Sequence, residues 1–421
     1  MTTESSTARV PAWTGGQYSL YRVLFGAYLA THFAQLLPHG RELFSSEGVL
    51  PDGTASPLLV LFPNLFLLSD APSFVAAVLA LGVLASLAFL VGWRDRLAAV
   101  VLWVIWGSLF GRNPLISNPS LPYVGLLLLI HAGLPSAPYG SLAMRGRPDP
   151  GGDWHLPRAL HRVAWILMSV GYSFSGATKL VSPSWRNGTA LERVLANPLA
   201  RPGGLRLALL ELPEVLLRLA TWGALAFELA FVLLALSRRL RPLAWAAMLA
   251  MHLALILLID FADLSIAMVF LHLFTFDPAW VRAKRASEPL EIYYDGECGL
   301  CHRAVRFALA EDPDGETFRF APLQGPTFEE RVNEETRANL PDSILLRTPD
   351  GALLDRSSAV GRMLLALGGL WRLLGHLLLL VPRVLRDTGY DGVARIRKRI
   401  FAKPEGLCPI VPPAIGRRFL P

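Results

Sequence analysis

The chain has 421 residues, of which 53% are hydrophobic and 17% charged, with 40 Lys and Arg against 33 Asp and Glu. The formal net charge of +7 does not indicate a nucleic-acid-binding protein, because neither a basic platform interleaved with aromatic residues nor a reading helix is present. All three cysteines lie after residue 290, which excludes a disulfide-stapled N-terminal part.

Long apolar runs before about residue 280 predict a membrane domain of about eight helices. The runs lie at about residues 18–37, 73–92, 97–111, 121–134, 159–180, 215–236, 242–259 and 264–278. A spanning helix needs about 20 residues, so we expect the shorter runs to be tilted, longer than drawn or re-entrant. The polar start, Met1 to Arg9, and the long first run predict no cleaved signal peptide.

Basic residues between the runs predict the orientation of the helices. Most follow even-numbered helices, namely Arg94, Arg96, Arg145, Arg147, Arg158, Arg238, Arg239, Arg241, Arg282, Lys284 and Arg285. Because positive loops stay in the cytoplasm, we expect a multi-pass inner-membrane protein with a cytoplasmic C-terminal part. The loop after the fifth helix is an exception, with Arg186, Arg193, Arg201 and Arg206. Basic residues at 395–399 predict contact with anionic membrane lipid.

Ionisable residues inside the apolar runs are candidates for chemistry, because each is costly there unless it is paired or hydrated. They are His32, His131, Lys179, Glu228, His252, Asp260, Asp263 and His272. Such groups also commonly serve only to tie helices together. Two interpretations of Lys179 stay open: an ammonium beside a cavity, or a lysine that snorkels to the outer interface beside Trp185.

The stretch from Gly171 to Leu180, followed by Trp185 and Gly188, resembles the HTTM domain, which is shared with the vitamin K-dependent gamma-carboxylases. The resemblance covers about residues 15–285 and includes His252 and the closing Asp277-Pro278-Ala279-Trp280. It implies that Lys179 acts as a base towards reduced vitamin K, and hence a quinone cofactor. The chain departs from the carboxylases at Asn118-Pro119-Ser120, where they carry an Asn-His pair, so glutamate carboxylation is not implied.

Two of the three cysteines, Cys298 and Cys301, lie one helical turn apart after a predicted strand at 290–294 and a turn. A helix N-terminus would lower the pKa of Cys298 and make it the nucleophile, with Cys301 as the resolving thiol. Two other interpretations stay open. The letters up to His302 spell the haem-attachment pattern C-x-x-C-H, and the pair could be a metal half-site or unreactive. Zinc would need further ligands, and His302 with Cys408 gives an irregular set.

The segment Tyr294 to Cys301 resembles the opening of the DCC family of thiol-disulfide oxidoreductases. Later segments agree, in the order Ser343 to Leu346, Asp350-Gly351, Ser358 to Val360, Leu385 to Tyr390, Ala394 to Arg397 and Cys408-Pro409. The resemblance spans about residues 289–421 and implies a thioredoxin-like fold with disulfide exchange. It adds Asp295 to the two cysteines as a site residue, and makes Pro341 the candidate for a cis-proline facing them.

The sequence therefore predicts a mainly α polytopic membrane bundle over residues 1–285 and a small α/β thioredoxin-like domain over residues 289–421. The expected function is that of a membrane-tethered thiol-disulfide oxidoreductase of the protein-disulfide reductase type, without a metal. The alternatives are a quinone-dependent, carboxylase-like membrane enzyme with Lys179 as base and the dithiol as reductant, and a membrane part that is only an anchor or scaffold. We expect an amphipathic helix or helix pair at 363–381 and a structural role for Cys408.

Overall fold

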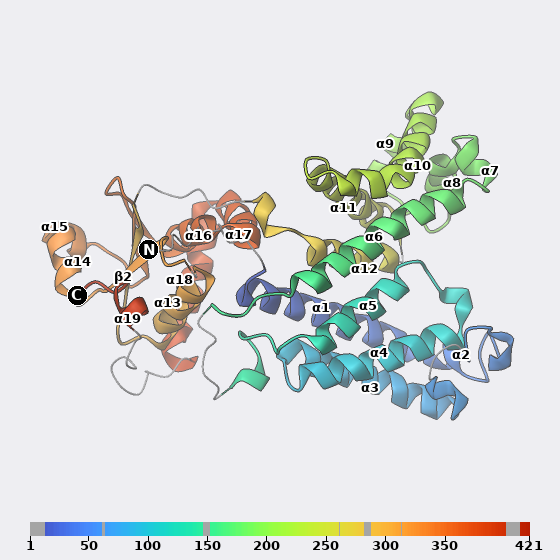
Figure 1. Cartoon of the computed structure of the whole chain (residues 1–421), viewed down its shortest axis with the longest axis horizontal. Coiled ribbons are helices and arrows are strands. Elements are labelled where there is room, and N and C mark those ends of the chain that lie inside the picture. Colours follow the sequence, from blue (N-terminus) through green and yellow to red (C-terminus); the bar gives the residue numbers. More distant parts are fainter. Residues whose placement is uncertain are drawn as a thin grey trace, which may run out of the picture.

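The computed structural model describes residues 13–60, 64–145, 152–260, 262–281, 288–312, 314–400 and 413–421. It is mostly helical, with a small α/β part at the C-terminal end of the chain (Figure 1). Cys408 lies outside the described residues.

All eight apolar runs form helices. They are α1 (Gly15–Leu36), α3 (Pro72–Val91), α4 (Asp95–Arg112), α5 (Leu121–Gly133), α6 (Arg158–Lys179), α10 (Glu214–Leu236), α11 (Arg241–Leu258) and α12 (Asp263–Thr275). The intervening segments form the short helices α2 (Gly40–Phe44), α7 (Pro183–Arg186), α8 (Ala190–Ala196) and α9 (Gly204–Leu210). The predicted helical character of the runs is therefore confirmed.

Three of these helices, α3, α10 and α11, are long and apolar enough to cross a membrane. The expected count of about eight spans is thus supported for three helices only. Helices α5 and α12 have 13 residues each, which is shorter than a span needs. Helix α1 has 22 residues but carries Arg22 and His32.

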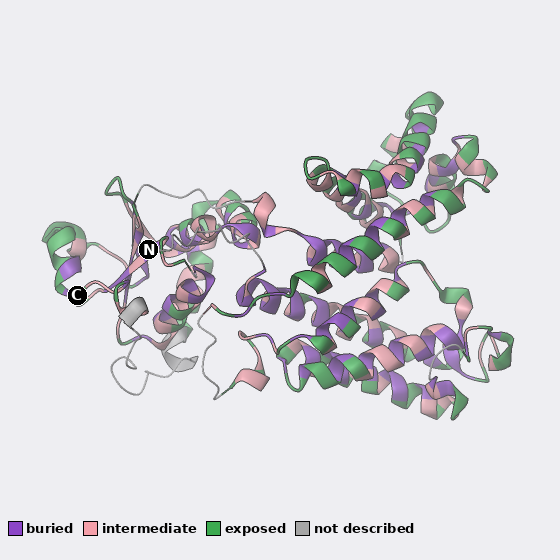
Figure 2. Ribbon diagram, viewed as in Figure 1, coloured by how far each residue is buried: buried purple, intermediate pink, exposed green. Residues whose placement is uncertain are grey.

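Large apolar side chains on the three candidate spans face outwards (Figure 2). The most exposed include Leu84 on α3, Leu233 and Leu236 on α10, and Leu243 and Leu257 on α11, at 64–71% of their surface. A soluble monomer rarely exposes apolar patches of this extent, so these faces are suited to lipid.

Helix α1 packs in the centre of the bundle through residues spaced three or four apart. Tyr18, Tyr21, Phe25, Leu29 and Phe33 are buried. The contact with α3 is close because Gly26 lacks a side chain, and a Cβ there would lie 2.8 Å from the Leu90 Cα. This aromatic row connects α1 with α3, α4, α5 and α12 in one core.

Arg22 of α1 is fully buried and holds the end of α3. Its guanidinium donates to the carbonyl oxygens of Phe89 (2.8 Å), Leu90 (2.6 Å) and Gly140 (2.7 Å). The Phe89 carbonyl also accepts from the N–H of the C-cap residue Gly92 (3.1 Å), so the arginine and this turn together cap the C-terminus of α3. Gly92 then reverses the chain with a φ of 67°, a backbone conformation that favours glycine.

The four-stranded sheet of the C-terminal part has the order β2-β1-β3-β4. Strand β1 (Leu290–Tyr294) pairs in parallel with β2 (Phe318–Pro322) and antiparallel with β3 (Leu345–Arg347), which pairs antiparallel with β4 (Leu353–Asp355). The helices are α13 (Gly299–Glu311), α14 (Pro326–Arg331), α15 (Glu334–Ala338), α16 (Arg356–Leu367), α17 (Gly369–Leu380), α18 (Arg383–Ile400) and α19 (Pro413–Gly416). Helix α13 connects the parallel strands β1 and β2, as such a pair requires.

The segment 363–381 forms the end of α16 and all of α17, so the predicted helix pair is confirmed. Gly368 and Gly369, with φ values of 77° and 54°, separate the two helices. Met363 and Trp371 are buried, whereas Leu377 and Leu380 are exposed. Helix α16 packs on β3 and β4, whereas α17 packs on α16 and, through Trp371, on Phe307 of α13, and the exposed leucines form an apolar strip on its outer face.

The two parts of the molecule meet at Glu311, the last residue of α13. Its buried carboxylate accepts hydrogen bonds from the Gly16 N–H (2.9 Å), the Trp371 Nε1 (2.5 Å) and the Thr14 hydroxyl. Thr14 and Gly16 belong to the start of α1, so an acidic side chain of the sheet domain lies at the N-terminus of a bundle helix, where the helix dipole favours negative charge.

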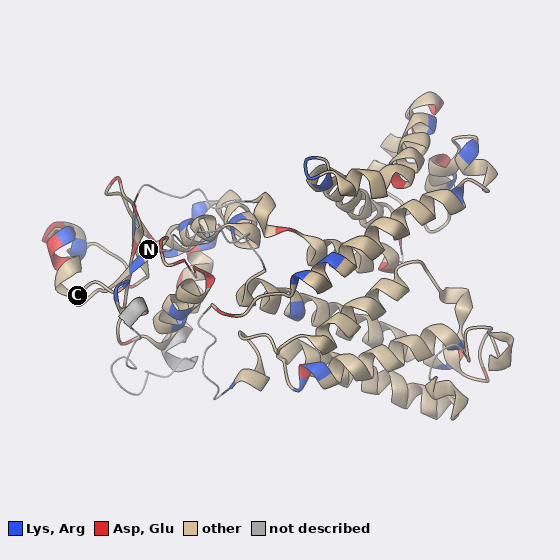
Figure 3. Cartoon of the chain, viewed as in Figure 1, with Lys and Arg blue, Asp and Glu red and all other residues tan. Residues whose placement is uncertain are grey.

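Basic residues at the beginnings of α4 and α6 lie on the side of the bundle that faces the sheet domain (Figure 3). Arg241, at the start of α11, lines the same groove as Arg158 at the start of α6. Three of the basic loops that were predicted to share one side of the membrane are therefore at one end of the bundle.

Candidate functional site

The two cysteines lie at the start of α13, directly after the turn that follows β1. Cys298 is the N-cap residue, with extended backbone angles, and its carbonyl accepts the first helical hydrogen bond from the His302 N–H (3.1 Å). Cys301 is three residues further on, in the first turn. The first N–H groups of a helix have no carbonyl partner within the helix and form its positive dipole end, which stabilises a thiolate.

Asp295 shapes the turn that presents Cys298. Its Oδ1 accepts from the Glu297 N–H (2.9 Å) and from the Gln324 Nε2 (3.3 Å), and its carbonyl accepts from the Cys298 N–H (3.2 Å). An Asp side chain that accepts a hydrogen bond from the backbone N–H two residues later forms an Asx turn. Asp295 thus touches the backbone around the dithiol, and these contacts make it a positioning residue.

His302 closes the same turn from the helix side. Its Nε2 donates to the Gly296 carbonyl oxygen (2.8 Å), and its ring packs edge-on against the ring of Tyr294. This hydrogen bond occupies Nε2, so only Nδ1 of the ring could bind a metal ion while the turn keeps this form. Among the described residues, no group of three or more His, Cys, Asp or Glu side chains is placed to hold a metal ion.

Both thiols are buried, each with 5% of its surface exposed, and no disulfide joins them. Cys298 is therefore not exposed, although it stands at the start of the helix. The cysteines belong to an apolar cluster with Ile344 and Met363, against which Tyr390 of α18 packs. The Tyr390 hydroxyl accepts from the Ile344 N–H at 3.0 Å, which connects α18 with the start of β3. The sequence alone did not predict the packing of Tyr390 against this cluster, because α18 lies about 90 residues further along the chain.

The predicted cis-proline is not found. The described residues contain no cis peptide bond, and Pro341 therefore follows a trans bond in the loop before β3.

Comparison with known proteins agrees with this site. Residues 292–403 match the family described as DCC1-like thiol-disulfide oxidoreductase. An uncharacterized protein, YuxK, of Bacillus subtilis (strain 168) is 34% identical over 134 residues, which is 93% of that protein and 31% of this chain. The chain belongs to the DCC1-like family.

This membership rests on the sheet domain, because the matched residues begin inside β1. The bundle before residue 292 has no matching HTTM family. No solved structure matches the chain. The family match therefore includes the dithiol but none of the polar residues of the bundle.

Lys179, the last residue of α6, is held between two partners. Its Nζ lies 2.5 Å from both carboxylate oxygens of the buried Glu228 on α10, and 4.7 Å from the centre of the Trp185 ring. Gly176, one turn earlier, allows this approach, because a Cβ there would lie 2.8 Å from the Leu229 nitrogen. Lys179 does reach Trp185, as snorkelling predicts, but its ammonium is paired with Glu228 and its side chain is 24% exposed.

Two of the predicted bundle histidines, His252 and His272, meet at Tyr172, about two helical turns before Lys179 on α6. The Tyr172 hydroxyl lies 2.8 Å from the His252 Nε2 and 3.4 Å from the His272 Nε2. The His272 Nδ1 donates to the Met268 carbonyl oxygen (2.8 Å), which leaves its Nε2 as an acceptor in the neutral ring. Asp260 is not part of this cluster, because it pairs with Arg201 at the surface.

The remaining predicted ionisable residues form separate pairs. His32 bonds Asp263 (3.1 Å), and His131 lies 3.3 Å from the carboxylate of Asp95 and 2.7 Å from the Tyr18 hydroxyl. Arg22 and Asp95 were missed in the sequence. Arg22 lies within the first apolar run, where a charged residue is itself a signal, whereas Asp95 lies between the second and third runs and gives no such signal.

Proposed function

We propose that the protein is a membrane-tethered thiol-disulfide reductase whose Cys298 and Cys301 exchange with a protein disulfide. The observation that carries the proposal is the placement of two cysteines at the N-cap and in the first turn of α13, inside the segment that matches the DCC1-like family. The order β2-β1-β3-β4, with α13 between the parallel strands, agrees with a thioredoxin-like fold.

The reaction proceeds in two exchanges. The Cys298 thiolate attacks one sulfur of the substrate disulfide and forms a mixed disulfide, while the second substrate sulfur leaves and takes a proton. Cys301 then gives up its proton and attacks the Cys298 sulfur, and the first substrate sulfur leaves as a thiol. Two electrons and two protons pass to the substrate, and a Cys298–Cys301 disulfide forms, which cellular thiols reduce again.

The buried thiols require a local opening before a protein disulfide can reach them. Tyr390 of α18 and the first turn of α13 pack in the same cluster, so displacement of α18 is the simplest route of access. The His302 bond to Gly296 favours this chemistry over haem attachment, because it keeps the imidazole at the turn.

Three features support a membrane location with the dithiol on the cytoplasmic side. The outward apolar faces of α3, α10 and α11 suit lipid. The starts of α6 and α11, with their arginines, lie at the end of the bundle to which the sheet domain docks. Positive loops stay in the cytoplasm, where a dithiol is kept mostly reduced and acts as a reductant.

The test is reduction of insulin disulfides by the full chain in detergent, with glutathione as the terminal reductant. Cys298→Ser and Cys301→Ser should each abolish turnover, and the matched control Cys408→Ser should retain it. Full activity in either of the first two variants would refute a dithiol mechanism.

A second candidate function is proton transfer to or from a quinone at Lys179. The specific observation is the Lys179–Glu228 pair, because an ammonium can act as a base only after it loses its proton, and both Glu228 oxygens are placed to receive it. Tyr172 of α6 and His252 of α11, which lie 2.8 Å apart, could donate hydrogen bonds to quinone oxygens. A bound quinone would supply the redox chemistry.

This site lies at the opposite end of α6 from the sheet-domain junction. The helix has 22 residues, or about 33 Å at 1.5 Å per residue. Direct exchange between Lys179 and the dithiol is therefore excluded in this arrangement. Oxidation of reduced vitamin K by the purified protein, with dissolved oxygen as the oxidant that takes the two electrons, should be lost in Lys179→Met and Glu228→Gln but kept in the control Arg201→Gln, and this result would support the second candidate. Equal rates in all variants would reject it.

A further inference from the structure

A groove of about 560 Å³ opens between α6, α10 and the turn η6 (Pro278–Trp280), at the sheet-domain end of the bundle. One face of α6 lines it, and the residues change character along that face. Arg158, His161 and Arg162 come first, and Trp165, Ile166 and Val170 follow at helical spacing.

The polar end of the groove carries a positive charge that the protein does not neutralise. Three arginines and one aspartate, Asp277, line it, which gives a formal charge of +2 with His161 neutral. Arg241 is held in place, because its Nε donates to the Ala235 carbonyl oxygen (2.6 Å) and its guanidinium lies over the Trp165 ring. Arg158 and Arg162 are exposed, and within the described part of the chain neither has an acidic partner.

The other end of the groove is apolar and open to the surroundings. Ile166 and Val170 on α6 are 60% and 53% exposed, and Leu236 on α10 is 71% exposed. Arg158 to Val170 spans about 18 Å along α6 at 1.5 Å per residue, which is enough for a headgroup followed by the first part of an acyl chain. Because α10 is itself a candidate span, this end of the groove faces the lipid in the proposed membrane arrangement.

We propose that the groove binds one anionic phospholipid, with its phosphate at Arg158, Arg162 and Arg241 and an acyl chain along Ile166 and Val170. The proposal rests on the membrane location proposed above, but not on the dithiol chemistry. It follows from charge complementarity, because guanidinium groups bind phosphate bidentately and the adjoining wall is apolar.

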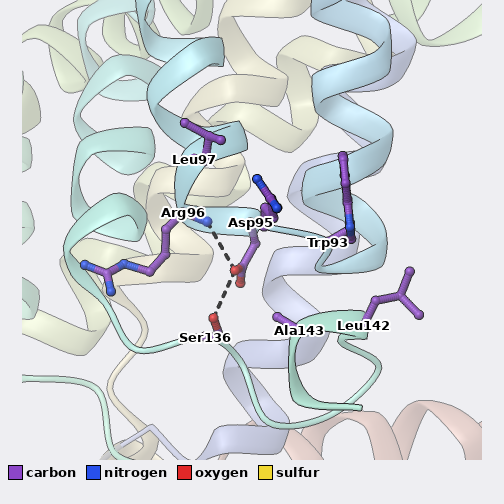
Figure 4. A pocket seen from close by; sticks show the side chains of 8 residues that line it. Trp93, Asp95, Arg96, Leu97, Ser136, Leu142 and Ala143 are labelled. Carbon is purple, nitrogen blue, oxygen red and sulfur yellow. Dashed lines mark hydrogen bonds between the residues drawn. The ribbon is translucent and has the colours of Figure 1, made fainter. Parts of the chain in front are cut away.

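A second groove at the same end, of about 540 Å³ beside the turn between α3 and α4, lacks this charge pattern (Figure 4). Its wall contains the carboxylate of Asp95, which accepts from the Ser136 hydroxyl (3.0 Å) and the Arg96 N–H (3.1 Å). The Arg96 Nε is already bonded to the Ala132 carbonyl oxygen (2.9 Å). By the same count, Arg94, Arg96 and Asp95 give the second groove a formal charge of +1, against +2 for the first groove, so the first groove is the more favourable site for an anion.

The test uses the full chain in a neutral detergent and phosphatidylglycerol with brominated acyl chains, which quenches tryptophan fluorescence on contact. Trp165 forms the floor of the groove. We expect saturable quenching by this lipid, and binding at least tenfold weaker with brominated phosphatidylcholine. The variant Arg158→Gln/Arg162→Gln should weaken phosphatidylglycerol binding about tenfold or more, since each basic residue near a lipid surface contributes about 1 kcal/mol.

The matched control is Arg238→Gln/Arg239→Gln, which removes the same charge from exposed residues outside the groove. An equal loss in the control would show only diffuse surface attraction and would overturn the proposal, as would equal binding of the two lipids. Displacement of the lipid by millimolar inorganic phosphate alone would indicate a free-anion site instead. Photo-crosslinking of phosphatidylglycerol to wild-type peptides of α6 checks the position without a variant, and crosslinks elsewhere only would also overturn it. Insulin reduction in the same preparations separates these outcomes from failure of the dithiol proposal.

Discussion

Cys298 and Cys301 differ in their position on α13, and this difference predicts their roles. Cys298 is the N-cap residue, the position that adjoins the N–H groups without a helical carbonyl partner, whereas Cys301 lies within the first turn. We expect Cys301→Ser to accumulate a mixed disulfide with a substrate protein, and Cys298→Ser to accumulate none, as read by non-reducing gels and mass spectrometry. The reverse pattern would assign the attack to Cys301.

Arg22 is expected to be the most sensitive charged residue of the bundle. Arg22→Met keeps the volume but removes the guanidinium donor from the carbonyls of Leu90 and Gly140, at about 1–3 kcal/mol for each buried unsatisfied group, whereas the Phe89 carbonyl keeps the Gly92 N–H. We expect a clear fall in the unfolding temperature in detergent, whereas the exposed control Arg238→Met should unfold as the wild type does. Equal stability of the two variants would mean that water replaces the guanidinium.

Single residues were predictable from sequence where the signal is local. Lys179 and Trp185 are six residues apart and do meet, and both cysteines fall where the strand-turn-helix pattern predicts. The partner of Lys179 was not predictable, because Glu228 is 49 residues away and sequence does not give the register between α6 and α10. The burial of Cys298 was missed for the same reason.

At the scale of elements, α13 joins the dithiol to the bundle, since its first turn holds the cysteines and its last residue is Glu311. Burial raises the pKa of the Glu311 carboxyl, against the lowering effect of its hydrogen bonds from Thr14, Trp371 and Gly16. A raised folded-state pKa means that folding takes up a proton. The contribution of Glu311 to stability is therefore full below the ordinary glutamate pKa and falls as the pH rises through the folded-state pKa.

We expect this pH dependence to disappear in Glu311→Gln. The difference in unfolding temperature between wild type and variant should be largest near pH 4 and should shrink towards pH 7, while the exposed control Glu297→Gln should show no such trend. A difference that grows with pH would mean that the α1 dipole, not burial, dominates at this carboxylate.

The existence of elements was predicted better than their relation to a membrane. Eight apolar runs became eight helices because apolar length is a local property. Their spanning character was supported for three only, since α1, α4 and α6 carry polar residues that the structure uses for internal contacts, such as Arg22 and Asp95. The break at Gly368 and Gly369 likewise follows from local conformational freedom.

For the whole molecule, the decisive prediction is topological. If the basic loops and the DCC1-like domain face the cytoplasm, a membrane-impermeant maleimide should not label Cys298 in intact cells, even in the variant Tyr390→Ala, which loosens the packing at the site. Labelling should occur in inverted membrane vesicles once α18 is displaced, for example in Tyr390→Ala. Labelling in intact cells would place the dithiol outside and favour an oxidase role.

The contacts at the start of α1 also determine when the molecule can be completed during synthesis. The Trp13 indole donates to the carbonyl oxygen of Phe276, 263 residues later, and Gly16 donates to Glu311, 295 residues later. Helix α1 therefore waits for Phe276 and Glu311, which are synthesised much later, before the groups at its own first turn are satisfied. A nascent chain stopped before α13 would present Thr14 and Gly16 unsatisfied at the end of the bundle, where a quality-control protease could distinguish it from the finished protein.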